Sequence, residues 1–194
     1  MPKKSNAQAS YKPVGKIEVW IWGQRVGVLA LDPKLGYYVF AYDPKFTQTG
    51  IELSPLQMPL HHVDPFVFTD LPPNTYYRLP AMLADALPDD FGNALIDRYM
   101  AERGLAKSQI TALDRLAYMG KRAMGALEFK PVQGPTAEKP TAIILSDLVS
   151  EARRVLHGKM RGARSKIFLQ HILAVGSSAG GARAKAVIAW NEKT

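Results

Sequence analysis

The sequence contains no cysteine, which excludes a disulfide framework and any metal site built on thiolates. It has no apolar run approaching the roughly 18 residues that a membrane-spanning helix needs. Residues 1–16 are rich in Lys, Ser and Pro without a hydrophobic segment, so they do not resemble a secretory signal. We therefore expect a cytoplasmic protein that does not insert into a membrane.

Positive charge is in excess and unevenly placed. The 194 residues include 25 Lys and Arg against 17 Asp and Glu, a net charge of +8. Residues 151–170 contain six basic residues and one acidic residue, Glu151. The six are Arg153, Arg154, Lys159, Arg161, Arg164 and Lys166. Such a tract can attract nucleic acid, a nucleotide or an acidic protein, but a solvated face gives the same pattern.

The first third of the chain reads as an antiparallel meander after a loose tail over residues 1–12. In segment 15–22, Ile17, Val19 and Ile21 alternate with other residues, which is the two-residue period of a strand. We expect a turn at Gly23-Gln24, a second strand over 25–31 and a third strand over 36–42. Trp20 and Trp22 lie on the other face, where they could stack on a ligand or pack in a core or interface.

The middle of the chain predicts helices. Segment 51–68 contains three prolines and is expected to be irregular, and its adjacent His61 and His62 indicate loop histidines rather than a metal site. Segment 79–103 is helical but split by Pro88, with Asp89 or Asp90 as the cap of its second half. We expect a third helix from Ser108 to Met119 and a strand over 126–129.

Beyond a linker over 131–140, apolar residues recur at helical spacing and predict an amphipathic helix. They are Leu145, Leu148, Val149, Ala152, Val155 and Leu156.

A small, glycine-rich stretch at 176–185 then enters a short apolar run. Backbone N–H groups in such a loop can approach an anion closely because no Cβ intervenes, and Arg183 and Lys185 add two cations beside it. Phosphate suits this arrangement; a flexible linker or tight hairpin would look the same.

Four blocks of the sequence, in order along the chain, resemble the HipA-type toxins, which are serine/threonine protein kinases of bacterial toxin–antitoxin modules. The first block is the opening strands with Leu53-Ser54-Pro55-Leu56-Gln57-Met58-Pro59-Leu60, and the second runs from Leu79-Pro80 through Leu87-Pro88-Asp89-Asp90 to Arg98. The third combines Asp114-Arg115-Leu116-Ala117-Tyr118-Met119-Gly120 with Met124-Gly125-Ala126-Leu127-Glu128-Phe129. The fourth is Gly176 to Lys185. The third block is the most diagnostic. The resemblance implies an α+β fold. A HipA-like N-terminal subdomain over 13–130 would combine an antiparallel meander or small barrel with a helical segment, and the beginning of a kinase N-lobe would follow over 131–194.

The resemblance also implies roles for the glycine-rich loop. It would cover the phosphates of ATP, bound with Mg²⁺ in the whole kinase, through Ser177, Ser178, Ala179, Gly180, Gly181, Ala182, Arg183 and Lys185. Ser178 matches the family's autophosphorylated serine. A phosphate there would place about −1.5 to −2 charges where ATP phosphates must sit. Ala184 stands where many members carry proline.

Protein-kinase chemistry also needs a catalytic Asp and Asn and a metal-binding Asp, which in this family follow the glycine-rich loop. The printed sequence has no such segment after the loop, so we expect a catalytically inactive N-terminal part of a larger kinase, with weak or absent ATP binding. The family implies a helix-turn-helix antitoxin resembling HipB, which would supply the DNA contact, and a protein substrate such as an aminoacyl-tRNA synthetase. The alternatives are a stand-alone binding module that restrains a separate kinase or binds an antitoxin, and direct DNA binding by the 153–166 tract.

Overall fold

Three antiparallel strands open the part of the chain that the computed structural model describes, residues 11–123 and 125–134. These strands are β1 (Lys16–Ile21), β2 (Gln24–Asp32) and β3 (Tyr37–Tyr42). Alternate residues of β1 are buried, as the two-residue period predicts, and they face the core. The predicted meander is confirmed.

The turn between β1 and β2 lies one residue earlier than the sequence indicated. Ile21 pairs with Gln24, so the two turn residues are Trp22 and Gly23. Both adopt left-handed backbone, with φ of 47° and 79°. A two-residue hairpin turn of this hand matches the twist of the strands, but it favours Asn or Gly over Trp at its first position. The sequence pattern places Trp22 in the strand and Gly23 first in the turn, because Trp is unfavourable in left-handed backbone.

A fourth strand, β4 (Leu127–Lys130), joins the sheet from more than 80 residues away in the described chain. It pairs antiparallel with β1, which gives the strand order β3-β2-β1-β4. Its bounds are shifted by one residue from the predicted 126–129. At the opposite edge, Phe40 of β3 exchanges two backbone hydrogen bonds with Phe66.

The helices are short except for one. They are α1 (Pro44–Thr47), α2 (Pro73–Tyr76), α3 (Ala81–Ala84), α4 (Asp90–Ala101), the 3₁₀ turn η1 (Lys107–Gln109) and α5 (Ala112–Met119). The Asp89 carboxylate caps α4 by accepting from the Gly92 N–H at 2.9 Å, as predicted. The prediction that Ser108 starts the third helix is wrong, because Thr111 caps α5 instead.

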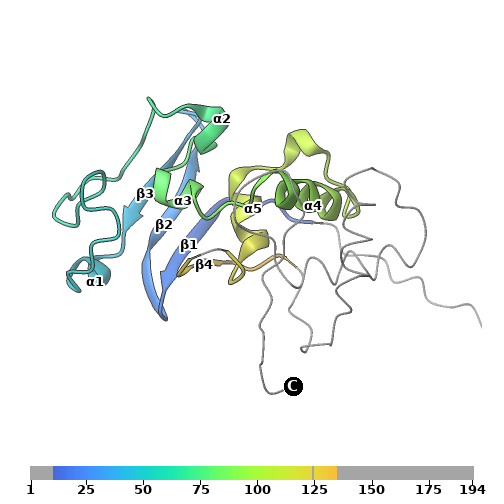
Figure 1. The fold of residues 1–194 in the computed structure, drawn as a ribbon. Helices are drawn as coiled ribbons and strands as arrows, with labels where there is room; N and C mark the ends of the chain where they lie inside the picture. The colour runs from blue at the N-terminus through green and yellow to red at the C-terminus, as the bar shows by residue number, and fades with distance from the viewer. Residues whose placement is uncertain (1–10, 124, 135–194) are drawn as a thin grey trace, which may run out of the picture.

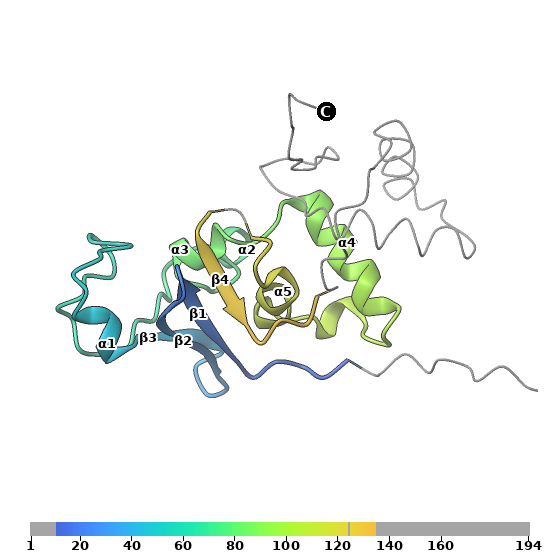
Figure 2. The same ribbon diagram turned by 90° about the horizontal axis from the view of Figure 1, so that it is seen from below.

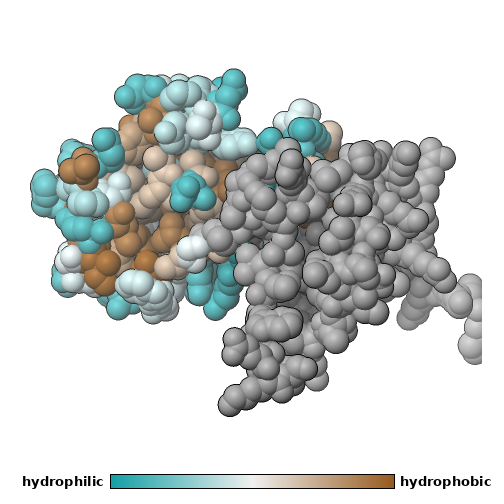
Figure 3. All heavy atoms as spheres, viewed as in Figure 1, coloured by the Kyte–Doolittle hydropathy of each residue, from teal (hydrophilic) through white to brown (hydrophobic). Residues whose placement is uncertain are grey.

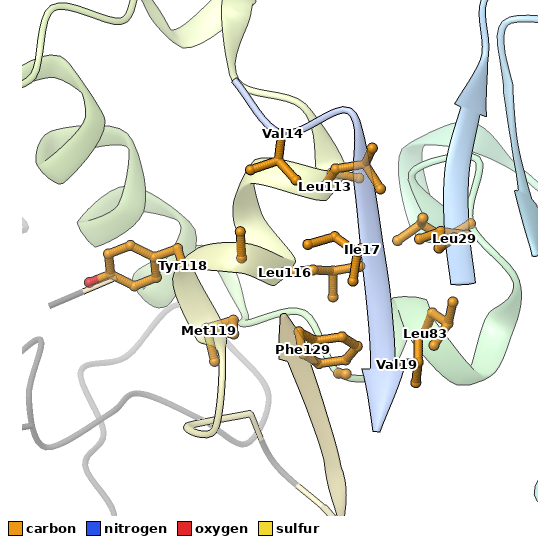
Figure 4. Packing of buried hydrophobic residues seen from close by; sticks show 14 of the residues in the cluster. Val14, Ile17, Val19, Leu29, Leu83, Leu113, Leu116, Tyr118, Met119 and Phe129 are labelled. Atoms are coloured by element: carbon orange, nitrogen blue, oxygen red, sulfur yellow. The ribbon is translucent and has the colours of Figure 1, made fainter. Parts of the chain in front are cut away.

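Helix α5 lies between the sheet and α4 in both views of the ribbon (Figures 1 and 2). Its Leu113 and Leu116 point toward Ile17 of β1, with Phe129 of β4 beside them (Figure 4). Leu116, Ile17 and Phe129 are fully buried. The core therefore forms where the sheet meets α5.

The structure confirms an α+β fold with an antiparallel sheet. Within the described residues, no helix is both long and apolar enough to span a membrane. The amphipathic helix predicted at 145–156 lies outside the described residues.

Candidate functional site

The predicted nucleotide loop lies outside the described residues. This covers all of its proposed contacts: Ser177, Ser178, Ala179, Gly180, Gly181, Ala182, Arg183 and Lys185. The basic tract at 153–166 also lies outside them. Those assignments stay predictions, and the site that can be built from geometry is the junction of α4, α5 and the N-terminal segment.

A fully buried carboxylate, Asp114, is the centre of this junction. Its Oδ1 accepts from the Tyr11 hydroxyl at 2.9 Å and from the Val14 N–H at 3.0 Å. Its Oδ2 accepts from the Thr111 N–H at 2.8 Å and from the Thr111 hydroxyl at 2.7 Å. A carboxylate has about four acceptor positions, and four donors occupy them here.

This saturation decides what Asp114 can do. A carboxylate whose acceptor positions are filled by protein donors has none left for a metal ion or a substrate proton. Tyr11 is buried, although the sequence predicts that it belongs to the loose tail. This burial and the charge of Asp114 raise the pKa of the Tyr11 hydroxyl. Asp114 therefore joins residues about 100 positions apart and is not a catalytic acid or base.

The next residue, Arg115, ties α5 to α4. Its guanidinium donates to Asn93 Oδ1 at 2.9 Å and to Asp97 Oδ1 at 2.7 Å. Lys107 approaches the other Asp97 oxygen at 3.1 Å. Because Arg115 is 92% buried and both of its contacts lie on α4, it fixes how the two helices face each other.

Two tyrosines and two arginines pack where α4 and α5 end. The rings of Tyr99 and Tyr118 meet edge to face with centroids 4.9 Å apart. The Arg103 guanidinium lies 3.5 Å from the centre of the Tyr99 ring, and that of Arg122 lies 4.8 Å from the Tyr118 ring. The Tyr118 hydroxyl is the one buried side-chain oxygen or nitrogen of the described residues without a hydrogen-bond partner, and burial raises its pKa.

The face of the sheet away from the core carries a chain of polar contacts. Lys130 of β4 lies 3.4 Å from the ring centre of Trp20, whose Nε1–H donates to Glu18 at 3.0 Å. Arg25 bridges Glu18 and Asp43, donating to the latter at 2.6 Å. The Lys45 N–H and the Arg25 guanidinium hold the pKa of Asp43 below its usual range. Lys130 therefore occupies one face of Trp20.

Trp22 differs from Trp20, because its side chain is 71% exposed at the hairpin tip. His61 and His62 are exposed on the loop before Phe66, as the sequence indicated. Among the described residues, no three His, Asp or Glu side chains gather in a way that could hold a metal ion. Trp22, His61 and His62 are therefore solvent-exposed residues of a turn and a loop.

Sequence reasoning missed Tyr11, Val14 and Thr111 as partners of Asp114. The Thr111-x-x-Asp114 spacing is a capping-box signal that could have placed the start of α5. No local pattern connects Asp114 to residues 100 positions earlier.

Comparison with protein families matches residues 17–130 to the HipA N-terminal domain, which is more than half of the chain. No curated protein sequence matches the chain.

Proposed function

This chain belongs to the HipA family, and we propose that it provides the N-terminal, non-catalytic part of a serine/threonine protein kinase that acts as a toxin of a type II toxin–antitoxin system. The observation that carries the proposal is the HipA N-terminal domain over 17–130, followed in the sequence by a glycine-rich loop at 176–185. The proposed activity of the whole kinase is ATP-dependent phosphorylation of a protein serine, which inhibits translation and growth.

In this proposal the two regions have separate tasks. Ser177 to Lys185 would hold the phosphates of Mg-ATP, and Ser178 would be the serine whose phosphorylation repels the nucleotide. The N-terminal domain would act through its surfaces, because its buried carboxylate is saturated by protein donors. The proposed partners are a helix-turn-helix antitoxin, which contacts DNA, and a protein substrate such as an aminoacyl-tRNA synthetase.

Three experiments on the 194-residue chain test this division. Calorimetry with Mg-ATP should show no micromolar binding, and incubation with radiolabelled ATP should transfer no phosphate, because these 194 residues contain no Asp after the loop that could bind Mg²⁺ as in kinases. A helix-turn-helix protein encoded beside the gene should co-purify with the tagged chain. Micromolar affinity for Mg-ATP together with failure to bind that neighbour would contradict the proposal.

A second candidate is a stand-alone module that restrains a separate HipA-type kinase. The junction around Asp114 favours it, since all donors to this buried carboxylate, Tyr11, Val14 and Thr111, belong to the same N-terminal part of the chain. Co-expression distinguishes the two functions. A restraining module lowers the growth arrest caused by a separate HipA-type kinase, whereas a kinase part leaves that arrest unchanged.

A further inference from the structure

Segment 46–77 exposes acidic and apolar side chains to solvent. The segment contains no Lys or Arg, whereas Glu52, Asp64 and Asp70 are all exposed. Leu56 and Val63 are 91% and 95% exposed, although most leucine and valine side chains are buried in folded proteins. We call Glu52, Leu56, Val63, Asp64 and Asp70 the loop surface. In Figure 3, brown side chains stand among teal ones on the side of the molecule that carries α1 and the loop after it.

The backbone beneath the loop surface is fixed. The Met58 side chain is 99% buried, and its carbonyl accepts from the Tyr42 hydroxyl at 2.9 Å. The Leu60 N–H donates to the Glu52 carboxylate at 3.3 Å, and Phe66 is bridged to β3. Leu56 and Val63 therefore stay exposed on a loop that does not collapse over them, which lowers the entropy cost of binding a partner there.

The charge of the chain is complementary to this surface. Residues 11–134 contain 13 Lys and Arg and 13 Asp and Glu, so this part of the chain is neutral. Residues 135–194 contain ten basic and four acidic residues, six of the basic ones within 153–166. The apolar positions predicted to share one helix face begin just before them, at 145–156. A segment with an apolar stripe and a basic flank is the counterpart of a surface with two exposed aliphatic side chains and three carboxylates.

We propose that segment 145–166 of this chain docks on the loop surface of the same molecule. The stripe that includes Leu148 and Val155 covers Leu56 and Val63, and the basic side chains face Glu52, Asp64 and Asp70. The connection is long enough, because the 19 residues from Gly134 to Arg153 span up to roughly 60 Å when extended. A domain of this size has a radius of gyration of only about 14 Å. This inference does not depend on kinase activity.

Carbodiimide cross-linking of the 194-residue chain tests the contact directly, since it couples carboxylates to amines that touch. Mass spectrometry should find Glu52, Asp64 or Asp70 joined to Lys159 or Lys166, and 1 M NaCl should abolish these products by screening. A mixture of ¹⁴N- and ¹⁵N-labelled chains should give cross-links within one label only. Cross-links that mix the labels, or an absence of these pairs at low salt, would overturn the proposal.

Tryptic cleavage provides a second readout that needs no carboxylate. The loop surface has no trypsin site, whereas segment 153–166 has six. The double variant Leu56→Ser, Val63→Ser should speed cleavage in 153–166 by about fivefold or more, and Asp64→Asn with Asp70→Asn should act in the same direction. Leu35→Ser is the matched control, because Leu35 is 57% exposed on a different turn.

Near-ultraviolet circular dichroism confirms that each variant keeps its fold. Cleavage of 153–166 at the same rate in folded wild type and folded double variant would show that the segment is not docked there. Equal acceleration by Leu35→Ser would show that the effect is not specific to the loop surface. Neither result bears on antitoxin binding or on ATP binding, so the proposed function is tested separately.

Discussion

The meander β1–β3 and the junction around Asp114 are held together in different ways. Strand pairing in the meander joins residues close in sequence, such as Ile21 with Gln24 and Asp32 with Tyr37. The junction joins Asp114 to Tyr11 and Val14, which lie 103 and 100 positions away. The sheet is thus held by many backbone pairings between neighbouring strands, whereas the junction depends on the side chain of Asp114.

The largest expected effect is at that side chain. Asp114→Ala leaves the buried Tyr11 hydroxyl and Val14 N–H, and the partly buried Thr111 N–H, without an acceptor. This should lower the free energy of unfolding by about 3–5 kcal/mol. Urea denaturation of the full chain measures the change. Asp70→Ala, at an exposed acidic position, should change it by less than about 0.5 kcal/mol. Similar losses of unfolding free energy in both variants would show that Asp114 contributes no more to stability than an exposed acidic residue.

Tyr11 and Tyr118 sharpen the comparison, because a Tyr→Phe substitution removes the same hydroxyl group from a hydrogen-bonded site and from a site without a hydrogen-bond partner. Tyr11→Phe removes a donor to a buried carboxylate and should cost about 1.5–3 kcal/mol. Tyr118→Phe removes a buried hydroxyl that has no hydrogen-bond partner and should be neutral or slightly stabilising. Thermal and urea unfolding of both variants decide this. A larger loss for Tyr118→Phe would reverse our view of the two sites.

The hairpin tip is the one place in the meander where a side chain conflicts with its backbone. Trp22→Asn should raise the free energy of unfolding by about 1 kcal/mol, because Asn tolerates the left-handed conformation better than Trp does. Gly23→Ala should lower it by about 1 kcal/mol for the converse reason. If Trp22→Asn destabilises the chain, the exposed indole makes a contact that outweighs its backbone strain.

The smallest effect concerns the outer face of the sheet, and it depends on pH. The folded pKa of Asp43 is depressed, so its contribution to stability is present above the unfolded pKa of about 3.9 and is lost as the pH falls through the folded pKa. Asp43→Asn keeps a capping oxygen for the Lys45 N–H but removes the charge. The stability difference between wild type and Asp43→Asn should therefore shrink between pH 6 and pH 3. A difference that stays constant with pH would show that the charge does not matter.

The meander could be predicted from the sequence, whereas the junction around Asp114 could not. The alternation of Ile17, Val19 and Ile21 gave the meander, because the period of a half-buried strand is local. Asp89 could be predicted as the cap of α4 because its only requirement is a donor three residues later. The junction could not, since nothing near Tyr11 indicates a partner at Asp114. The glycine-rich loop stays a prediction from resemblance and spacing.

The central claim is that one buried carboxylate joins the N-terminal segment to α5 independently of the meander. Amide hydrogen exchange measures it directly, because the Val14 N–H donates to Asp114 while the amides of β1 and β2 bond within the sheet. We predict that Asp114→Asn speeds exchange at Val14 by about 10- to 100-fold more than it speeds exchange of the β1 and β2 amides. Loss of protection in the strands to the same extent as at Val14, or rapid exchange of Val14 in the wild type, would contradict it.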